Sequence, residues 1–212
     1  MELSQYIEHT SLHPTATIAN IKTLCHEAIN YHFYGVCVPE CYVSIARNIL
    51  KDEALKIIAV VGFPLGNQST VAKVCEAKHA ILLGASEIDM VMNLGFLKSG
   101  LHDKVSSEIA EVKKAIGKHT LKVILETCYL SDEEITAACG LAIKGKADFV
   151  KTSTGFGTGG ATLKDVAIMK KASGGILKIK ASGGIKDRTT AMQFIAAGAN
   201  RIGTSSGVHL VL

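Results

Sequence analysis

Tryptophan is absent from this sequence of 212 residues, proline occurs only three times, and aromatic residues make up 5%. No sign of charge dominates either, because 23 Lys and Arg against 19 Asp and Glu give a formal charge of +4. The longest apolar stretch, residues 57–66, contains Pro64 and is far shorter than the ~20 residues of a membrane-spanning helix. We therefore expect no nucleic-acid partner and no membrane partner. The remaining composition, 48% hydrophobic and 20% charged, is typical of a globular protein.

Paired metal ligands and a secretion signal are also missing. Cys37 and Cys41 have the spacing C-x3-C without a second pair, and the eight histidines form no H-E-x-x-H group. We therefore expect no metal site. The N-terminus has Glu2 and lacks the basic and then apolar order of a signal peptide, so we expect a cytoplasmic protein whose six cysteines stay reduced.

Short runs rich in β-branched residues recur between longer amphipathic stretches. Eight of them are predicted strands: Glu8–Leu12, Gly35–Pro39, Ile57–Phe63, Glu87–Met92, Leu121–Glu126, Asp148–Ser153, Leu177–Ser182 and Arg201–Ser205. Strands separated by helices run parallel, and eight such units close most naturally into one (β/α)8 TIM barrel. With no linker or shift in composition, residues 1–212 are predicted to form a single α/β domain.

The predicted helices have recognisable ends. In 103–116 the apolar residues recur at steps of three and four, as on one face of a helix. Ser131 with Glu134, and Thr162 with Asp165, have the spacing of a capping box, and Asp187 can cap the next helix. Glycines at 84 and 198, and more loosely at 145, are placed where helices end, because a left-handed residue commonly terminates a helix.

Two lysines are predicted inside the barrel. Alternation puts Lys151 on one face of its strand with Phe149 and Ser153, and Lys180 on one face of the next strand with Lys178 and Ser182. Both lie near the carboxyl ends of their strands, where barrel enzymes keep their active sites. The simpler alternative is that either lysine reaches solvent or pairs with an acid, but a buried unpaired lysine is rare.

A lysine pair has a chemical use. An amine attacks a carbonyl only when it is neutral, and an ordinary lysine with a pKa of ~10.4 is protonated at neutral pH. A second ammonium ~5 Å away repels the charge by about 3 kcal/mol, and partial desolvation can supply the rest. We therefore expect Lys151 to form a Schiff base while Lys180 keeps its proton.

Asp89, in the predicted strand 87–92, is the third candidate. A carboxylate in a mouth that carries a lysine charge stays ionised and can move protons through a water molecule. A simple ion pair with Lys180 is an equally acceptable interpretation, and both can hold together. Glu8 and Glu126, near the ends of their strands, are secondary candidate acids.

Glycine-rich turns follow the last three predicted strands: 155–160, 182–184 and 203–207. Glycines let backbone N–H groups approach an anion, and the loops after strands seven and eight are the usual phosphate site of a barrel. With Lys186 close by, the three turns predict a phosphorylated substrate. The alternative is that they are only tight βα turns.

A dinucleotide site is a competing interpretation of the first turn. Gly155, Gly157 and Gly160 satisfy G-x-G-x-x-G between a strand and a helix. That site also needs an acid about twenty residues further on to bind the ribose hydroxyls. Here that region contains Lys178 and Lys180, and no acid occurs between Asp165 and Asp187. The dinucleotide interpretation is therefore a distant alternative.

The chain resembles the deoxyribose-phosphate aldolase family along essentially its full length. The segments that carry the resemblance are E-H-T at 8–10, G-V-C-V at 35–38 with Cys41, V-G-F-P-L-G at 61–66, E-I-D-M at 87–90, L-E-T-C-Y-L at 125–130, F-V-K-T-S-T-G-F-G-T-G-G at 149–160, K-A-S-G-G-I at 180–185 and I-G-T-S-S-G at 202–207. The resemblance implies a class I aldolase without metal or cofactor. Such an enzyme splits 2-deoxy-D-ribose 5-phosphate reversibly into acetaldehyde and D-glyceraldehyde 3-phosphate.

The resemblance also implies roles for single residues. Lys151 would form the Schiff base, Lys180 would tune it, and Asp89 would serve proton transfer. The residues expected to bind the phosphate and the sugar are Gly155, Gly183, Gly184, Ser205, Ser206, Thr10 and Cys37. Members of the family are commonly homo-oligomers, so we expect a dimer or tetramer.

Several positions depart from the family pattern. His13 replaces the usual lysine of L-K-P, Pro39 and Glu40 stand where N-P-C is usual, and Lys186 replaces an arginine, which loses a bidentate contact to phosphate. Lys178 stands where relatives are often small and is predicted to line the barrel floor against an acid, and the chain ends at Leu212 without the tail of some members. The second hypothesis is therefore a sugar-phosphate binder that has lost turnover.

Overall fold

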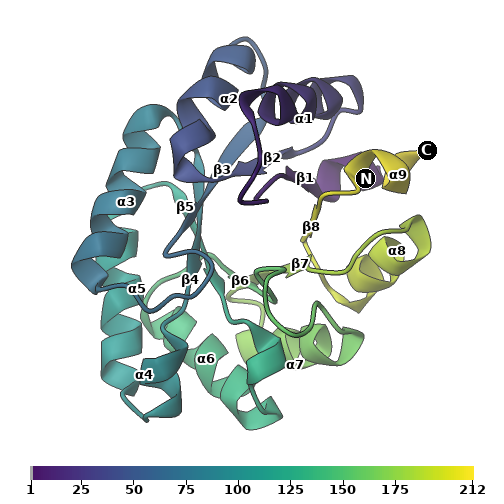
Figure 1. The fold of residues 1–212 in the computed structure, drawn as a ribbon. Helices are drawn as coiled ribbons and strands as arrows, with labels where there is room; N and C mark the ends of the chain where they lie inside the picture. The colour runs from purple at the N-terminus through teal and green to yellow at the C-terminus, as the bar shows by residue number, and fades with distance from the viewer. Residues whose placement is uncertain (1) are drawn as a thin grey trace.

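The computed structural model describes residues 2–212. Its strands pair in parallel in the order of the sequence, and β8 pairs with β1 to close a barrel, as Figure 1 shows along the barrel axis. The strands are β1 Ile7–Thr10, β2 Gly35–Val38, β3 Lys56–Val61, β4 Glu87–Val91, β5 Thr120–Ile124, β6 Phe149–Lys151, β7 Lys178–Ser182 and β8 Arg201–Thr204. The predicted (β/α)8 fold is confirmed.

Helices surround the strands, and the two ends of the chain lie side by side next to α9 (Figure 1). The α-helices are α1 Ile18–Asn30, α2 Val43–Ile49, α3 Thr70–Leu83, α4 Leu94–Lys98, α5 His102–Ile116, α6 Asp132–Lys144, α7 Leu163–Ser173, α8 Arg188–Ala197 and α9 Gly207–Val211. Short 3-10 helices occur at η1 Leu3–Tyr6, η2 Glu40–Tyr42 and η3 Thr127–Tyr129. Within residues 2–212, none of these helices has the length and apolar character needed to cross a bilayer.

The predicted helix ends are largely present. The side chain of Ser131 accepts a hydrogen bond from the Glu134 backbone and the reciprocal bond completes a capping box, while Thr162 and Asp187 cap α7 and α8. Gly84 and Gly198 end α3 and α8 in the left-handed conformation. Gly145 does not, because its φ is −78° and the next residue, Lys146, adopts the positive φ of 60°.

Alternate residues of a strand lie in two different environments. In β4, Ile88 and Met90 belong to the large apolar core between the strands and the helices, whereas the buried Glu87 and Asp89 occupy the alternate positions. A smaller apolar cluster, Cys37, Ile58 and Val60, is separate from that core. The barrel interior is therefore partly apolar and partly ionic, and the ionic part positions the site.

Seven of the eight predicted strands extend too far at their carboxyl ends, whereas the strand predicted at 177–182 ends at Ser182 as expected. The strand predicted at 57–63 ends at Val61 because Gly62 turns the chain with a φ of 62°. The strand predicted at 148–153 is paired only over Phe149–Lys151. Beyond it, the N–H of Thr154 donates to the carboxylate of Glu126 instead of to a neighbouring strand. These residues form the βα loops at the barrel mouth.

Candidate active site

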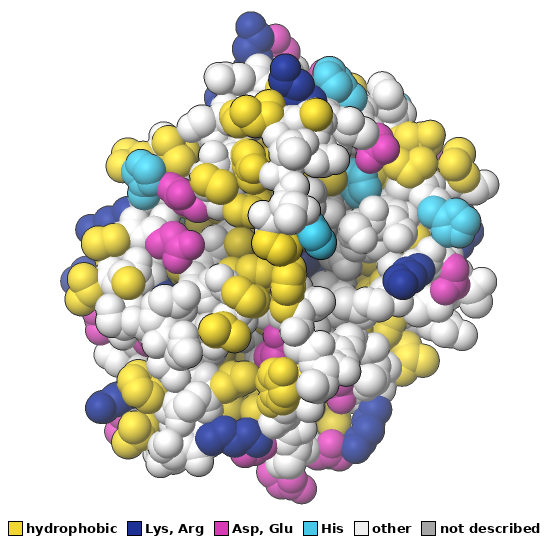
Figure 2. Space-filling view, viewed as in Figure 1, with side chains coloured by type: hydrophobic (Ala, Val, Ile, Leu, Met, Phe, Trp, Pro, Cys, Tyr) yellow, Lys and Arg dark blue, Asp and Glu magenta, His cyan; other side chains and the backbone are white. Residues whose placement is uncertain are grey.

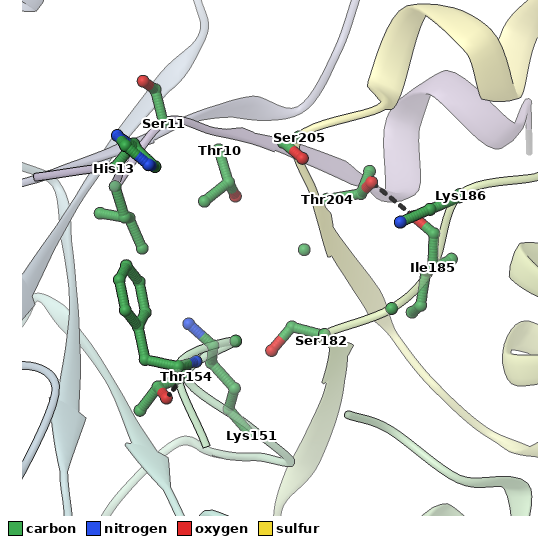
Figure 3. Close-up of a pocket in the computed structure, with 16 residues that line it drawn as sticks. Thr10, Ser11, His13, Lys151, Thr154, Ser182, Ile185, Lys186, Thr204 and Ser205 are labelled. Carbon is green, nitrogen blue, oxygen red and sulfur yellow. Dashed lines mark hydrogen bonds between the residues drawn. The ribbon is translucent and has the colours of Figure 1, made fainter. Parts of the chain in front are cut away.

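A cavity of about 330 Å³ opens at the carboxyl ends of the strands, between the segments that follow β1, β6, β7 and β8. Figure 3 shows the amine of Lys151 reaching into it between Thr154 and Ser182, with Thr10 and Ser205 on the other side. The residues singled out from the sequence that line this cavity are Thr10, Lys151, Gly155, Gly183, Gly184, Lys186 and Ser205. In the space-filling view, charged side chains lie mainly toward the rim of the face and apolar side chains run down its middle (Figure 2).

Four other candidate residues do not line the cavity. Asp89, Lys180 and Cys37 are fully buried. Burial raises the pKa of the Cys37 thiol, so this side chain stays protonated. Ser206 belongs to the loop after β8, where its N–H donates to the hydroxyl of Thr204 at 2.9 Å. Asp89 and Lys180 therefore lie outside the lining of the cavity, and Asp89 contacts the amine of Lys151.

Lys151 and Lys180 face each other across neighbouring strands, as the alternation predicts. Their backbones are paired in register between β6 and β7. One oxygen of Asp89, Oδ2, accepts from both amines, at 2.9 Å from Lys151 Nζ and 2.6 Å from Lys180 Nζ. The ion pair between Asp89 and Lys180 that the sequence left open is present, and it includes Lys151 as well.

Three charged residues that the sequence analysis left out of the catalytic set complete this network. Lys122 lies 3.1 Å from the other oxygen of Asp89 and also pairs with Glu87. Glu8, a secondary candidate in the sequence, pairs with Lys180 and lies 3.4 Å from Lys122. Lys122 carries the same signal as Lys180, a lysine at an inward position of a buried strand, and alternation alone could have found it.

The charges of the network determine its protonation states. Burial opposes ionisation of Asp89, but Lys122, Lys151 and Lys180 together outweigh it and hold the pKa of Asp89 well below its usual range. Burial also opposes the charge of Lys122 and Lys180, yet Asp89 and Glu8 raise the pKa of both amines above the ordinary value. Lys180 is therefore a firmly protonated group beside Lys151.

The charge balance differs from the one expected from the sequence. That expectation weighed the repulsion between Lys151 and Lys180, with one carboxylate nearby. The structure places three carboxylates among three lysines, so the net charge of the buried network is close to zero when all six groups are ionised. Repulsion from Lys180 is thus partly offset by Asp89, which contacts both amines.

The glycine turns meet at one end of the cavity. Gly183 and Gly184 both have positive φ, 89° and 79°, a conformation that glycine adopts readily and that residues with a side chain seldom adopt. A Cβ on Gly160 would lie 2.3 Å from the carbonyl oxygen of Gly183, so this glycine lets the loops after β6 and β7 touch. The exposed Lys186 lines the same end and supplies a positive charge there.

The unusual positions of the sequence lie in different places. His13 lines the main cavity, whereas Pro39 and Glu40 line a smaller one of about 250 Å³ beside it. Lys178, predicted to meet an acid on the barrel floor, is instead exposed and lies over the ring of Phe149 at 5.7 Å. That prediction is wrong because Lys178 is the first residue of β7, at the open lower end of the barrel.

The fold and the cavity together define a (β/α)8-barrel enzyme with a buried lysine at the floor of its mouth. The chain belongs to the DeoC/LacD family of aldolases, whose model matches residues 3–210.

Named relatives cover the whole chain. A deoxyribose-phosphate aldolase of Caldanaerobacter subterraneus subsp. tengcongensis is 52% identical over 100% of this chain and 93% of its own length. One of Thermococcus gammatolerans is 51% identical over 100% of this chain and 96% of its own length. Among solved structures, "QR15, an Aldolase" has a TM-score of 0.96 at 41% identity, covering 100% of this chain and 95% of its own. The tetrameric deoxyribose phosphate aldolase from Aeropyrum pernix has a TM-score of 0.90 at 31% identity, covering 99% of this chain and 89% of its own.

Proposed function

We propose that this aldolase reversibly cleaves 2-deoxy-D-ribose 5-phosphate to acetaldehyde and D-glyceraldehyde 3-phosphate through a Schiff base on Lys151. The observation that carries the proposal is the amine of Lys151 at the cavity floor, 2.9 Å from a carboxylate oxygen that Lys180 also contacts. The names of the relatives agree with this substrate. A class I aldolase needs a lysine that can attack a carbonyl and a group beside it that moves protons.

The proposed reaction begins at C1 of the open-chain sugar. Neutral Lys151 attacks C1, and loss of water from the carbinolamine gives an iminium ion. Removal of the proton from the C3 hydroxyl breaks the C2–C3 bond, so C3 leaves as the aldehyde of glyceraldehyde 3-phosphate. The electron pair of that bond forms an enamine at C2, which is then protonated. Hydrolysis of the resulting imine releases acetaldehyde and restores Lys151.

Asp89 and Lys180 carry the protons in this scheme. Lys180 holds its proton firmly because the carboxylates of Asp89 and Glu8 are beside it. Asp89 stays ionised because three lysines are beside it. A water molecule held by this pair would take the C3 hydroxyl proton and return it to C2 of the enamine. Lys122 and Glu87 hold the other end of Asp89 in place.

The phosphate would bind at the opposite end of the cavity from the imine. Gly183, Gly184, Ser205 and Lys186 line that end and offer backbone N–H groups, a hydroxyl and a cation, while Gly155 lines the cavity next to Thr154. Ser206 follows directly, and Thr10 lies on the sugar side (Figure 3). Cys37, which lines no part of the cavity, would act only by packing beneath it.

We also propose that residues 1–212 act as one domain, that the chain assembles into a homodimer or homotetramer, and that it works in the cytoplasm on small aldehydes and sugar phosphates. The A. pernix relative is described as tetrameric, which supports an assembly. Light scattering coupled to gel filtration measures the assembly, and a single cooperative unfolding transition is expected for one domain.

The variant Lys151→Ala tests the reaction. It should lose cleavage of 2-deoxyribose 5-phosphate by more than about a thousandfold, because the covalent intermediate has no amine to form on. Circular dichroism and binding of inorganic phosphate should be unchanged. The exposed Lys171→Ala on α7 is the matched control and should keep full activity. Substantial cleavage by Lys151→Ala would overturn the proposal.

A further inference from the structure

The carboxylate of Glu126 is buried just after β5 and has no part in the proposed reaction. The residue is 3% exposed and does not line the cavity. Its φ is 50°, in the left-handed region that residues other than glycine seldom occupy. Such a conformation costs about 1–3 kcal/mol and persists only where surrounding contacts fix it. The contacts of Glu126 must therefore hold its backbone in this conformation.

Both oxygens of Glu126 bind the same residue of the next βα loop. Oε1 accepts from the backbone N–H of Thr154 at 3.0 Å, and Oε2 accepts from the Thr154 hydroxyl. The hydroxyl oxygen of Thr154 in turn accepts from the N–H of Phe156 at 3.0 Å (Figure 3). Hydrogen bonds to an ionised acceptor are about twice as strong as neutral ones. One carboxylate thus holds the segment 154–156, which begins three residues after Lys151.

The segment that Glu126 holds is a wall of the cavity. Thr154, Gly155 and Phe156 all line it. The ring of Phe156 packs edge-on against Phe63, with centroids 5.4 Å apart, and lines the smaller cavity too, so it forms part of the wall between the two cavities. Gly157 lets the loop lie close to Glu126, because a Cβ there would be 3.2 Å from the carboxylate carbon.

We infer that Glu126 is a positioning residue for the phosphorylated part of the substrate, which acts through Thr154 without touching the substrate. By fixing 154–156 against β5, it sets the distance between the amine of Lys151 and the phosphate end of the cavity. The inference rests on the proposed function and adds to it a residue that controls binding of the phosphorylated portion rather than formation of the imine.

The variant Glu126→Gln tests the inference with little change of shape. The two donors of Thr154 bind two different oxygens of Glu126, and in glutamine one of these positions is an NH2 donor, so only one of the two contacts keeps its acceptor there. We expect KM for 2-deoxyribose 5-phosphate to rise about tenfold while kcat changes less than about threefold. Trapping of acetaldehyde on the protein by borohydride, which needs no phosphate, should proceed as in the unmodified protein.

Thr154 offers a second route to the same contact. Thr154→Val removes the hydroxyl without changing the strained residue at 126, and should raise KM as Glu126→Gln does. Thr154→Ser keeps the hydroxyl and should restore the KM. Because the two residues act through one contact, the KM of the double variant Glu126→Gln/Thr154→Val should be no higher than that of the single variant with the higher KM. The exposed Glu133→Gln on α6 is the control carboxylate and should leave KM unchanged.

Three results would overturn the inference. These are an unchanged KM in Glu126→Gln and Thr154→Val, effects that multiply in the double variant, or a loss of acetaldehyde trapping in parallel with cleavage. Thr154→Val decides the matter if Glu126→Gln does not fold. Failure of the unmodified protein to trap acetaldehyde is a different result, which would overturn the proposed function instead.

Discussion

Six ionisable side chains share the interior of the barrel, and each is held by partners of opposite charge. Asp89 contacts Lys122, Lys151 and Lys180. Burying a charge is costly unless a partner compensates for it, so the removal of one member leaves others buried and unpaired. The same arrangement fixes the position of the amine of Lys151, and precise positioning of reacting groups contributes much of catalysis.

Lys122 neither lines the cavity nor moves a proton in the proposed reaction, so its effect on stability can be measured apart from the chemistry. Lys122→Met should lower the free energy of unfolding by about 3–5 kcal/mol, since it leaves buried carboxylates short of a cation. Lys178→Met is the matched control, because Lys178 lies over the same ring of Phe149 at the same distance of 5.7 Å but is exposed. It should change the stability by less than about 1 kcal/mol. Urea denaturation measures both, and equal losses would contradict the assignment.

For single residues, the sequence predicts which face of a strand a side chain points to better than it predicts which residue that side chain pairs with. Alternation correctly places Lys151, Lys180 and Asp89 inside the barrel, because side chains of a strand point to opposite faces in turn. Which carboxylate pairs with which lysine depends on the stagger between strands, which no local pattern contains. The pairing of Lys122 with Glu87 and of Lys180 with Glu8 could therefore only be read from the structure.

Among the elements, the loops after β6 and β7 touch closely at Gly160 and Gly183. The Cα of Gly160 approaches the carbonyl of Gly183, whose oxygen also accepts from the N–H of Ala161 at 3.1 Å. Any side chain at 160 would push apart the two loops that are proposed to bind phosphate.

Gly160→Ala should therefore weaken binding of inorganic phosphate about tenfold or more, because the backbone contact cannot yield without moving Gly183. Gly140→Ala, on the exposed face of α6 where an added Cβ would meet nothing within 4 Å, should raise stability by about 1 kcal/mol. Isothermal titration with phosphate and thermal unfolding measure the two effects. Phosphate binding by Gly160→Ala equal to that of the unmodified protein would contradict the placement of the phosphate site.

Outside the barrel, α3 and α5 are joined by a buried ion pair. Lys73 Nζ lies 2.6 Å from Glu108 Oε1 and donates to the carbonyl of Val91 at 2.9 Å. Burial lowers the pKa of Lys73 and raises that of Glu108, and in each case it outweighs the attraction of the partner. Each shift disfavours the charged form, so this pair contributes less to stability than its short distance suggests.

The variant Lys73→Met should lose about 3–5 kcal/mol at neutral pH, because Glu108 is left buried without a cation. The loss should shrink as the pH falls through the raised pKa of Glu108, where the carboxyl becomes neutral. The double variant Lys73→Met/Glu108→Leu should be within about 1 kcal/mol of the original protein or more stable. Denaturant titrations at several pH values measure these free energies of unfolding. A double variant that is less stable than Lys73→Met would contradict the expectation.

The ends of the elements were harder to predict than their existence. Helix 102–116 and the caps at Ser131 and Asp187 follow from local patterns and are present. The strand ends depend on long-range bonds, such as the one from Thr154 to Glu126, which competes with strand pairing. The sequence contains no local mark of that competition, so the predicted strands extend into the loops.

For the molecule as a whole, the barrel could be predicted because eight similar βα units leave few other ways to bury their strands.

The buried ionic network makes the free energy of unfolding depend on pH. Asp89 has a lower pKa in the folded than in the unfolded chain, so its stabilising contribution is present above about pH 3.9 and is lost as the pH falls through the folded value. Lys122 and Lys180 have raised values, so theirs is present below about pH 10.4 and is lost as the pH rises through the folded values.

Asp89→Asn should therefore be less stable than the original protein by about 3–5 kcal/mol at pH 7, and the difference should narrow below about pH 3.9. The narrowing is expected because the acid form of Asp89 no longer pairs with the three lysines. Unfolding free energies measured in urea from acidic to neutral pH would show it. A difference that stays constant over this range would mean that Asp89 is not held ionised by the network.

Formation of a covalent adduct on Lys151 tests the central claim most directly. Incubation with acetaldehyde and borohydride, followed by digestion and mass spectrometry, should find one ethyl group on the peptide that contains Lys151, and none in Lys151→Ala. An unmodified Lys151, or an adduct confined to an exposed lysine such as Lys186, would contradict the account.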